Sequence, residues 1–340
     1  MDKFKIFSVT FNFLFIVIIS LAFGNIDKEK PTKSEESIDS LKLGIVLQPY
    51  TGSRGGPELS RGPEIVYKEL IKRLSEMGAE ESSKDVVKLT PEEEKDYGVW
   101  HRLGLADGHL GRIVARISKE EKFPLGLLGN CNSLMGMLAG LQQSGPTRRP
   151  LKVGLIWIDA HGDFNTPETT LSGMLGGMPV ACAAGKCLFR LRLKAGLDPA
   201  IPTKHIIMMC ARDLDPLEAE LIDNSDITMI STDEMVSWNQ KVQDAMARLT
   251  SQVDVIYVHI DLDVLDPAEI PGANLTAPNG PTAVQMGEAL KRMMGYQKVG
   301  AFGVASFPLA EEGRNKNMQS TLKVIGGVMA GLKSRETSQE

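Results

Sequence analysis

Two short stretches, each directly after a run of apolar residues, constrain the fold of this chain more than any other feature. The first is 159–165, Asp-Ala-His-Gly-Asp-Phe-Asn, which follows the apolar run 153–158. The second is 259–267, His-Ile-Asp-Leu-Asp-Val-Leu-Asp-Pro, which follows the run 253–258. Short runs rich in Val and Ile are typical of strands buried in a parallel sheet, because both faces of such a sheet are covered. We therefore expect an α/β fold with a site where these strands end.

The acidic residues of the two stretches are spaced so that their side chains can meet. Residues two apart in an extended segment point the same way, which groups Asp159, His161 and Asp163 in one set and Asp261 and Asp263 in the other. Four carboxylates in one cleft would raise one another's pKa unless a cation neutralised them. Oxygen donors with an imidazole favour a divalent ion such as Mn²⁺ over the ligands of structural zinc. The number of carboxylates predicts two ions that share bridging Asp oxygens.

The other apolar runs predict further strands, and the segments between them predict helices. With the two runs above they make eight candidate strands, the other six being 43–47, 86–89, 123–128, 205–210, 227–230 and 299–304. A flexible loop at 52–56 leads through 60–63 into an amphipathic helix, with Pro63 near its first turn, and a helical pattern runs from Pro91 to Ile117. If a helix begins after 129–131, Gly136 and Gly140 lie on one closely packed face.

Four motifs in order resemble the ureohydrolase superfamily of arginases, agmatinases and formimidoylglutamases. They are Gly129-Asn-Cys131 followed by Gly136; Asp-Ala-His-x-Asp-x-Asn with Ser172-Gly173; Arg212-Asp-Leu-Asp215-Pro216; and Asp-x-Asp-x-x-Asp-Pro from Asp261. The similarity runs from about Leu43 to Leu332 and is closest to the branch with Asn-Cys in the first metal motif. It implies an arginase-like, three-layer α/β/α domain at 41–335 around a mostly parallel, eight-stranded sheet.

The resemblance also implies roles for individual residues. It makes ligands of two Mn²⁺ ions of Cys131, Asp159, His161, Asp163, Asp261 and Asp263. Asp163 would also orient a metal-bound hydroxide that attacks the substrate carbon. Asn165, Ser172 and Asp215 would position the amino-acid end of the substrate, with a helix cap as the alternative role of Asp215. Most relatives carry a histidine at Cys131, and sulfur suits Mn²⁺ poorly, so this subsite is expected to be weak; a buried thiol that never touches metal is the alternative.

The chain departs from the family pattern at several positions. Arginase-like members have an Asn and a proton-shuttling His where this chain has Met174 and Gly176, and a guanidinium-binding Glu where it has Ala305. His259 precedes Asp261 by two residues, so it could orient the metal-binding carboxylates or supply the missing acid/base function. A core histidine is the alternative for His259.

Three functions are consistent with this sequence. The leading one is a manganese-dependent hydrolase that cleaves a C–N bond of a guanidino or amidino group on an amino-acid-like substrate, of the arginine or N-hydroxyarginine type. The second is hydrolysis of a formimidoyl group or amide on the same metals, which a polar group such as Ser306 at the substrate head would favour. The third is a non-catalytic metal-binding protein on the same fold.

The ends of the chain predict export. Residues 1–24 carry Lys3 and Lys5 ahead of the apolar run 6–23 and end in a small-x-small pattern, which is typical of a signal peptide. A signal anchor is the alternative, because the run approaches the length that spans a membrane. We expect a secreted protein, or a membrane-anchored one if the signal stays uncleaved. Residues 25–40 predict a disordered lead-in, and 336–340 a polar tail.

Charge and composition limit the expected partners. The net charge of −5 and pI of about 5.7 give no sign of a nucleic-acid-binding surface. The expected ligand is a small, amino-acid-like molecule, with no membrane contact beyond the N-terminal signal. The family resemblance suggests a trimer or hexamer.

Overall fold

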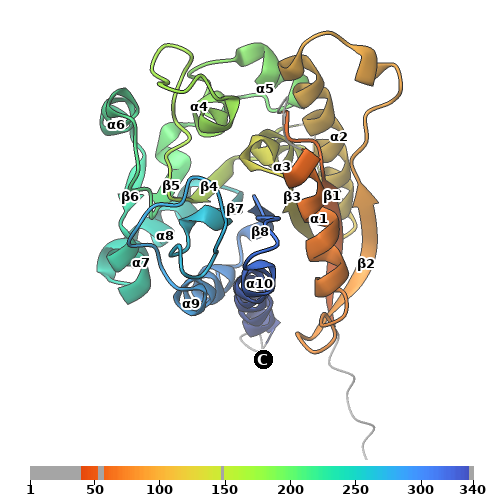
Figure 1. The fold of residues 1–340 in the computed structure, drawn as a ribbon, viewed down its shortest axis with the longest axis vertical. Coiled ribbons are helices and arrows are strands. Elements are labelled where there is room, and N and C mark those ends of the chain that lie inside the picture. Colours follow the sequence, from red (N-terminus) through yellow and green to blue (C-terminus); the bar gives the residue numbers. More distant parts are fainter. Residues whose placement is uncertain (1–39, 53–56, 147–148, 337–340) are drawn as a thin grey trace, which may run out of the picture. The chain divides into compact units, whose positions relative to one another are not determined.

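The computed structural model describes residues 40–52, 57–146 and 149–336, which are built around a sheet of eight parallel strands (Figure 1). The order across the sheet is β2-β1-β3-β8-β7-β4-β5-β6. The strands are β1 (Leu41–Gln48), β2 (Ala79–Val86), β3 (Phe123–Leu128), β4 (Val153–Ile158), β5 (Ile206–Met209), β6 (Thr228–Ile230), β7 (Val255–Asp261) and β8 (Val299–Ala305). Because every pairing is parallel, the carboxyl ends of all these strands lie at one edge.

Helices cover both faces of the sheet, so the predicted three-layer α/β/α architecture is confirmed. One face packs against α2 (Val99–Lys119), α3 (Leu134–Gln142), α4 (Pro179–Ala183) and α5 (Phe189–Ala195). The other packs against α1 (Pro57–Leu70), α7 (Thr232–Ser237), α8 (Gln240–Gln252), α9 (Ala283–Met294) and α10 (Arg314–Glu336). The remaining helix, α6 (Pro216–Asp223), follows β5.

Strand β4 illustrates why the central strands read as continuous apolar runs. Ile156 and Ile158 join the core under α7–α10, while Leu155 and Trp157 join the core under α2–α5. All four are fully buried. Each such side chain contributes roughly 1.5–3 kcal/mol relative to an exposed position, so both faces of the strand select apolar residues.

Strand β2 lies before the predicted position. We expected 86–89, but the strand is Ala79–Val86, a polar segment at the edge of the sheet that pairs with β1. An edge strand has a partner on one side and is partly solvated, so its sequence need not be apolar. Val87 from the predicted run is nonetheless buried, and its N–H donates to the Leu47 carbonyl at 2.9 Å.

Two helix starts also differ from the prediction. The expected helix from Pro91 is interrupted: Glu93–Lys95 form a short 3₁₀ turn, and α2 begins only at Val99. Between them Gly98 has φ of +99°, a conformation that ends regular helix geometry. Conversely, α1 begins at Pro57, so the segment 60–63, expected to lead into the helix, is already helical and Pro63 lies inside it.

The predicted N-terminal segments lie outside the described residues. These are the signal peptide, 1–24, and the lead-in apart from its last residue, Ser40; secretion therefore stays a prediction. Within the described ranges, every helix is too short or too polar to cross a bilayer.

The predicted close-packed face of α3 is confirmed. A Cβ at Gly136 would lie 2.7 Å from Leu110 Cδ2, and one at Gly140 would lie 2.5 Å from Val114 Cβ. Both neighbours belong to α2. The two glycines therefore let α3 approach α2 closely. Helix α3 begins at Leu134, after a 3₁₀ turn over Cys131–Ser133.

We predict that Gly140→Ala lowers the free energy of unfolding by about 1–3 kcal/mol, because the added methyl group meets α2 with no free space. Chemical denaturation measures the change. Gly326→Ala in α10 is the matched control, since nothing lies within 4 Å of its Cβ, and it should be neutral or slightly stabilising. Equal stability of the two variants would contradict this account of the α2–α3 contact.

Candidate active site

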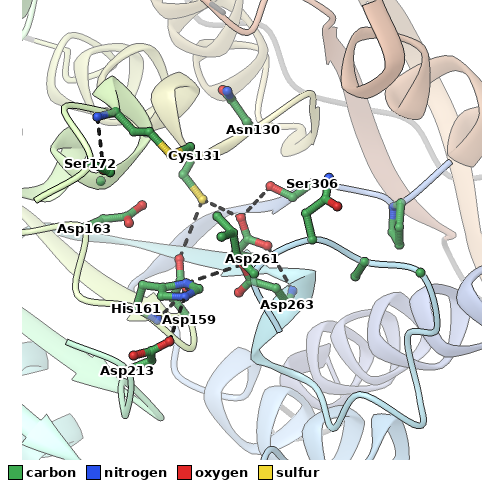
Figure 2. Close-up of a pocket in the computed structure, with 18 of the residues that line it drawn as sticks. Asn130, Cys131, Asp159, His161, Asp163, Ser172, Asp213, Asp261, Asp263 and Ser306 are labelled. Atoms are coloured by element: carbon green, nitrogen blue, oxygen red, sulfur yellow. Dashed lines mark hydrogen bonds and ion pairs between the residues drawn. The ribbon is translucent and has the colours of Figure 1, made fainter. Parts of the chain in front are cut away.

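Four adjacent central strands carry the candidate site at their carboxyl ends. Cys131 follows β3, Asp159 follows β4, Asp261 ends β7 and Ser306 follows β8. The register holds these ends level, with Ala305 of β8 paired to Leu128 on one side and to Asp261 on the other. The side chains consequently border one cavity of about 660 Å³ (Figure 2).

Four buried carboxylates crowd one side of this cavity. Their exposed fractions are 1% for Asp159, 7% for Asp163, 5% for Asp261 and 9% for Asp263. Burial, together with the repulsion of neighbouring carboxylates, raises the pKa of Asp261 to about 6 and that of Asp263 to about 7. Asp263 Oδ1 is buried without a hydrogen-bond partner. Such a cluster is costly unless cations neutralise it, so the donor set fits bound metal ions.

His161 lies among these carboxylates. Its Nδ1 is 3.2 Å from Asp159 Oδ1 and 3.5 Å from Asp263 Oδ2. Burial opposes its protonation, but the hydrogen bonds and charges of Asp159 and Asp263 prevail and raise its pKa to about 12. Without an ion, the imidazolium thus partly neutralises the cluster. A metal ion at this nitrogen would replace the proton.

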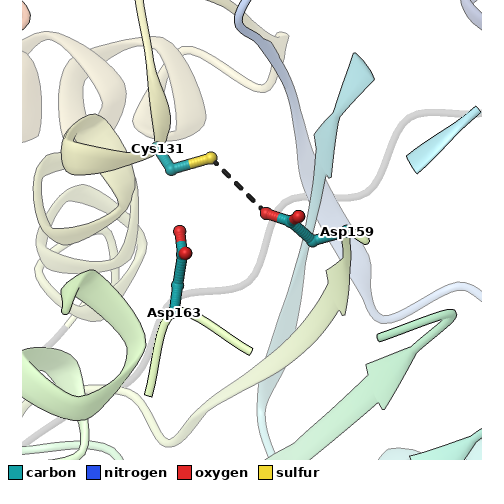
Figure 3. Close-up of side chains that lie close together, drawn as sticks. All are labelled: Cys131, Asp159 and Asp163. Atoms are coloured by element: carbon teal, nitrogen blue, oxygen red, sulfur yellow. Dashed lines mark hydrogen bonds between the residues drawn. The ribbon is translucent and has the colours of Figure 1, made fainter. Parts of the chain in front are cut away.

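The ligand atoms form two overlapping groups, each within 4.8 Å. One contains Cys131, Asp159 and Asp163 (Figure 3), and the other contains Asp159, His161 and Asp263. Because Asp159 belongs to both, its two oxygens are suited to bridge two ions. Asp261 lies beside these groups, where its Oδ2 accepts hydrogen bonds from Cys131 Sγ at 2.8 Å and Ser306 Oγ at 2.5 Å. The structure therefore brings all six predicted ligands to one cavity.

Cys131 is a buried thiol, 4% exposed, with Sγ 3.8 Å from Asp159 Oδ2. Burial and the charges of Asp261 and Asp159 raise its pKa well above the ordinary value. The group therefore stays protonated at neutral pH when no cation is nearby. Since only the thiolate binds metal, deprotonation opposes ion binding at this position.

His259 lies behind Cys131, completely buried. Its Nε2 is 3.3 Å from Cys131 Sγ, its Nδ1 is 2.9 Å from the Tyr257 hydroxyl, and its ring stacks on Trp157 with centroids 4.4 Å apart. Burial lowers its pKa to about 3, so the imidazole is neutral. His259 thus contacts a predicted ligand and is separated from the cavity by it, a position that suits orientation of Cys131 better than proton transfer to a substrate.

The three predicted substrate-binding residues, Asn165, Ser172 and Asp215, all line the cavity. Asn165 Nδ2 donates to Asp215 Oδ2 at 3.0 Å, and its Oδ1 accepts from Thr169 Oγ1 at 2.9 Å. Ser172 is exposed at the rim, and its Oγ accepts from the Met174 N–H at 3.2 Å. Asp215 is also the N-cap residue of α6, so the alternative role predicted for it is compatible with a place in the cavity.

Other cavity residues were missed by sequence reasoning. Glu218 is buried and accepts hydrogen bonds from the N–H groups of Phe164, at 2.7 Å, and Asp215, at 3.2 Å. It thereby joins the segment after β4 to α6, and the spacing Asp215-x-x-Glu218 of a capping box was the available signal. Arg61 of α1 and Arg314 of α10 also line the cavity, and neither belongs to a recognisable motif.

A parallel α/β/α fold with a cluster of carboxylates at its strand ends, in two groups suited to metal ions, is compatible with a metal-dependent hydrolase. The chain matches the Arginase family model over residues 43–322. An arginase from Bacillus subtilis strain 168 is 31% identical over 244 residues, which cover 70% of this chain and 80% of that protein. An arginase from Bacillus caldovelox is 29% identical over 226 residues, 66% of this chain and 74% of that one. The chain therefore belongs to the arginase family, and it is a hydrolase.

Solved structures agree with this fold. The Bacillus caldovelox arginase superposes with a TM-score of 0.72 at 25% identity, covering 85% of this chain and 98% of that one. A formimidoylglutamase from Bacillus subtilis superposes with a TM-score of 0.67 at 17% identity, covering 88% and 89%. The second likeness concerns the fold alone.

We predict that Mn²⁺ raises the melting temperature of the EDTA-treated protein more at about pH 8 than at about pH 5.5. In the metal-free protein, the raised pKa values of Asp261 and Asp263 mean that the folded state binds more protons than the unfolded chain. The contribution of these groups to stability therefore falls as pH rises from about 4 to about 7. Bound ions remove the repulsion that appears at high pH, and at low pH protons compete with them.

Differential scanning fluorimetry with and without Mn²⁺ at both pH values measures this effect. Asp244→Asn, an exposed position on α8, should respond to Mn²⁺ as the unmodified protein does. A shift that is equal at the two pH values, or larger at the lower one, would contradict metal binding by these carboxylates.

Proposed function

We propose that the chain hydrolyses a C–N bond of a guanidino or amidino group on an amino-acid-like substrate, of the arginine or N-hydroxyarginine type, using two Mn²⁺ ions. One observation supports this proposal above all. Two groups of candidate metal ligands, which share Asp159, line one side of a cavity of about 660 Å³. The 31% identity to a protein named arginase supports the guanidino group.

When bound, the ions would polarise the substrate and lower the pKa of a water molecule toward neutrality. The chain's own residues then divide the remaining work. Asp159 and Asp263 with His161 would hold one ion, and Asp159 and Asp163 with Cys131 the other. Asp163, two residues after His161, adopts a left-handed backbone conformation with φ of +47°. Its carboxylate would accept a hydrogen bond from the attacking water and orient it.

Two departures from the family pattern favour a modified guanidine over arginine. Gly176 lines the cavity with nothing within 4 Å of a Cβ built there, so the position implied for a proton-shuttling His is open space. Ala305 replaces the implied Glu, which removes a charge-assisted pair with a guanidinium of about 1.5–3 kcal/mol. Hydrolysis of an N-hydroxyguanidine releases hydroxyurea and expels the same side-chain amine as hydrolysis of arginine. An N-hydroxyguanidine is less basic than a guanidine, so it can bind in its neutral form and depends less on a carboxylate at position 305.

A second candidate, hydrolysis of a formimidoyl group or amide, is favoured by Ser306. Its hydroxyl lines the cavity beside Asp261, and its backbone has φ of +62°, a strained conformation that turns the side chain toward the metal cluster. A neutral hydroxyl next to Ala305 suits a neutral planar head group better than a guanidinium.

Two further proposals rest on sequence and family resemblance. We infer export of the mature chain from the composition of residues 1–24, and a homotrimer or homohexamer from the family resemblance. N-terminal sequencing of the exported protein and light scattering are the respective measurements.

The hydrolase proposal predicts release of urea or hydroxyurea from arginine or N-hydroxyarginine, or ammonia from a formimidoyl or amide substrate, by protein loaded with two Mn²⁺ ions. Asp163→Asn should lower kcat by about 100-fold or more, because the amide cannot accept the water's proton in the same way. Asp244→Asn on α8 should leave kcat unchanged.

Metal content and product release together decide between the alternatives. Two ions with no release from any of the three substrate types would contradict the hydrolase proposal for these compounds. Absence of bound metal after loading would contradict the hydrolase proposal and leave the fold as a binding scaffold.

A further inference from the structure

Arg61 and Arg314 are two arginines that line the metal cavity without an acidic partner. Neither guanidinium forms an ion pair with any residue in the described ranges. Arg314 is half-buried; its Nη2 donates to the Leu309 carbonyl at 2.8 Å, and its Nε is buried with no hydrogen-bond partner. An unpaired and partly buried guanidinium is unfavourable, so a missing anion is the simplest explanation of the arrangement at Arg314. Arg61 is exposed on α1 and adds a second guanidinium to the lining of the same cavity.

Both arginines adjoin the segment that follows β8. A Cβ at Gly62, next to Arg61, would lie 3.3 Å from Phe307 Cβ, and Arg314 is tied to Leu309. Residues 308–310, at or next to these contacts, line the same cavity. The two guanidiniums therefore belong to the β8 side of the site, beyond Ser306.

The opposite charge gathers on the β4–β5 side of the cavity, which β7 separates from β8 in the sheet. There Asp213, Asp215 and Glu218 line the cavity in addition to Asp159 and Asp163, which follow β4. Asn165, the predicted holder of a substrate carboxylate, already donates to Asp215. A carboxylate would meet acidic neighbours on this side and two free guanidiniums on the β8 side.

We propose that Arg61 and Arg314 form a subsite for an acidic group of the substrate. The substrate class is then a guanidino, amidino or amide compound with a terminal carboxylate, whose planar head faces the metal cluster and whose acid faces the two arginines. Guanidinium groups bind carboxylates through paired, charge-assisted hydrogen bonds. This inference rests on the proposed function for the identity of the head group.

The test compares two compounds that differ only in the acid, 5-guanidinopentanoate and pentylguanidine. Calorimetry on the manganese-loaded protein should give at least about tenfold tighter binding of the acid, as expected for one charge-assisted interaction. Arg61→Gln and Arg314→Gln should each reduce this ratio by about three- to tenfold while leaving pentylguanidine binding unchanged. Arg314→Lys keeps the positive charge but loses the paired N–H donors of the planar guanidinium, so its affinity ratio should be intermediate.

Arg73→Gln is the matched control, because Arg73 is exposed just after α1 and lies outside the cavity lining within the described ranges. Arg61 is exposed on its helix, so its replacement should leave the melting temperature unchanged. Where turnover is measurable, Arg61→Gln should raise KM for the acid with little change in kcat.

The possible results separate the subsite from the proposed reaction. Equal binding of the two compounds, or a ratio that survives both Gln variants, overturns the subsite whether or not urea is released. A ratio that depends on the arginines, without hydrolysis of any guanidine, supports the subsite and contradicts the proposed function. Failure of both compounds to bind contradicts both.

Discussion

The repulsion among four buried carboxylates is the interaction on which the rest of this structure depends. Asp159, Asp163, Asp261 and Asp263 are each at most 9% exposed, and no lysine or arginine pairs with them in the described ranges. Their proximity is imposed by the sheet, because adjacent parallel strands end level with one another. The hydrophobic cores on both faces supply the stability that keeps these charges together, and bound metal ions would relieve the cost.

The same register determines how closely residues of β8 approach the side chains of the adjacent strands. Ala305 lies between Leu128 and Asp261 in the sheet, and its side chain is buried in the core under α2–α5. Gly303, two residues earlier, approaches the Tyr257 hydroxyl so closely that a Cβ there would lie 2.1 Å from it. That hydroxyl contacts His259, and His259 contacts Cys131. The β8 backbone thus indirectly sets the position of the Cys131 thiol through two buried side chains.

Sequence reasoning reached the features that are local in the chain. Asp159, His161 and Asp163 stand two residues apart directly after an apolar run. The run predicted the strand, and the spacing predicted that these side chains gather at its end as candidate metal ligands. Edge strand β2 was misplaced because its partly solvated position permits the polar sequence of Ala79–Val86. The sequence allowed a core position for His259, which the structure has, but its contact with Cys131 and its stacking on Trp157 depend on neighbouring elements and could not be read from its spacing. Arg61 and Arg314 are separated by most of the chain, and only the fold brings them to one cavity.

The distribution of charge across the cavity follows from these placements. Two divalent ions would carry four positive charges, which balance the four carboxylates of the cluster. The remaining acids, Asp213, Asp215 and Glu218, lie on the β4–β5 side, and the guanidiniums lie on the β8 side. The electric field between the β4–β5 side and the β8 side discriminates between the two ends of a charged ligand. Reversing the ligand would place its negative group beside the acids and its positive group beside the arginines. The metal-filled cavity would therefore select the orientation of a charged substrate as well as its size.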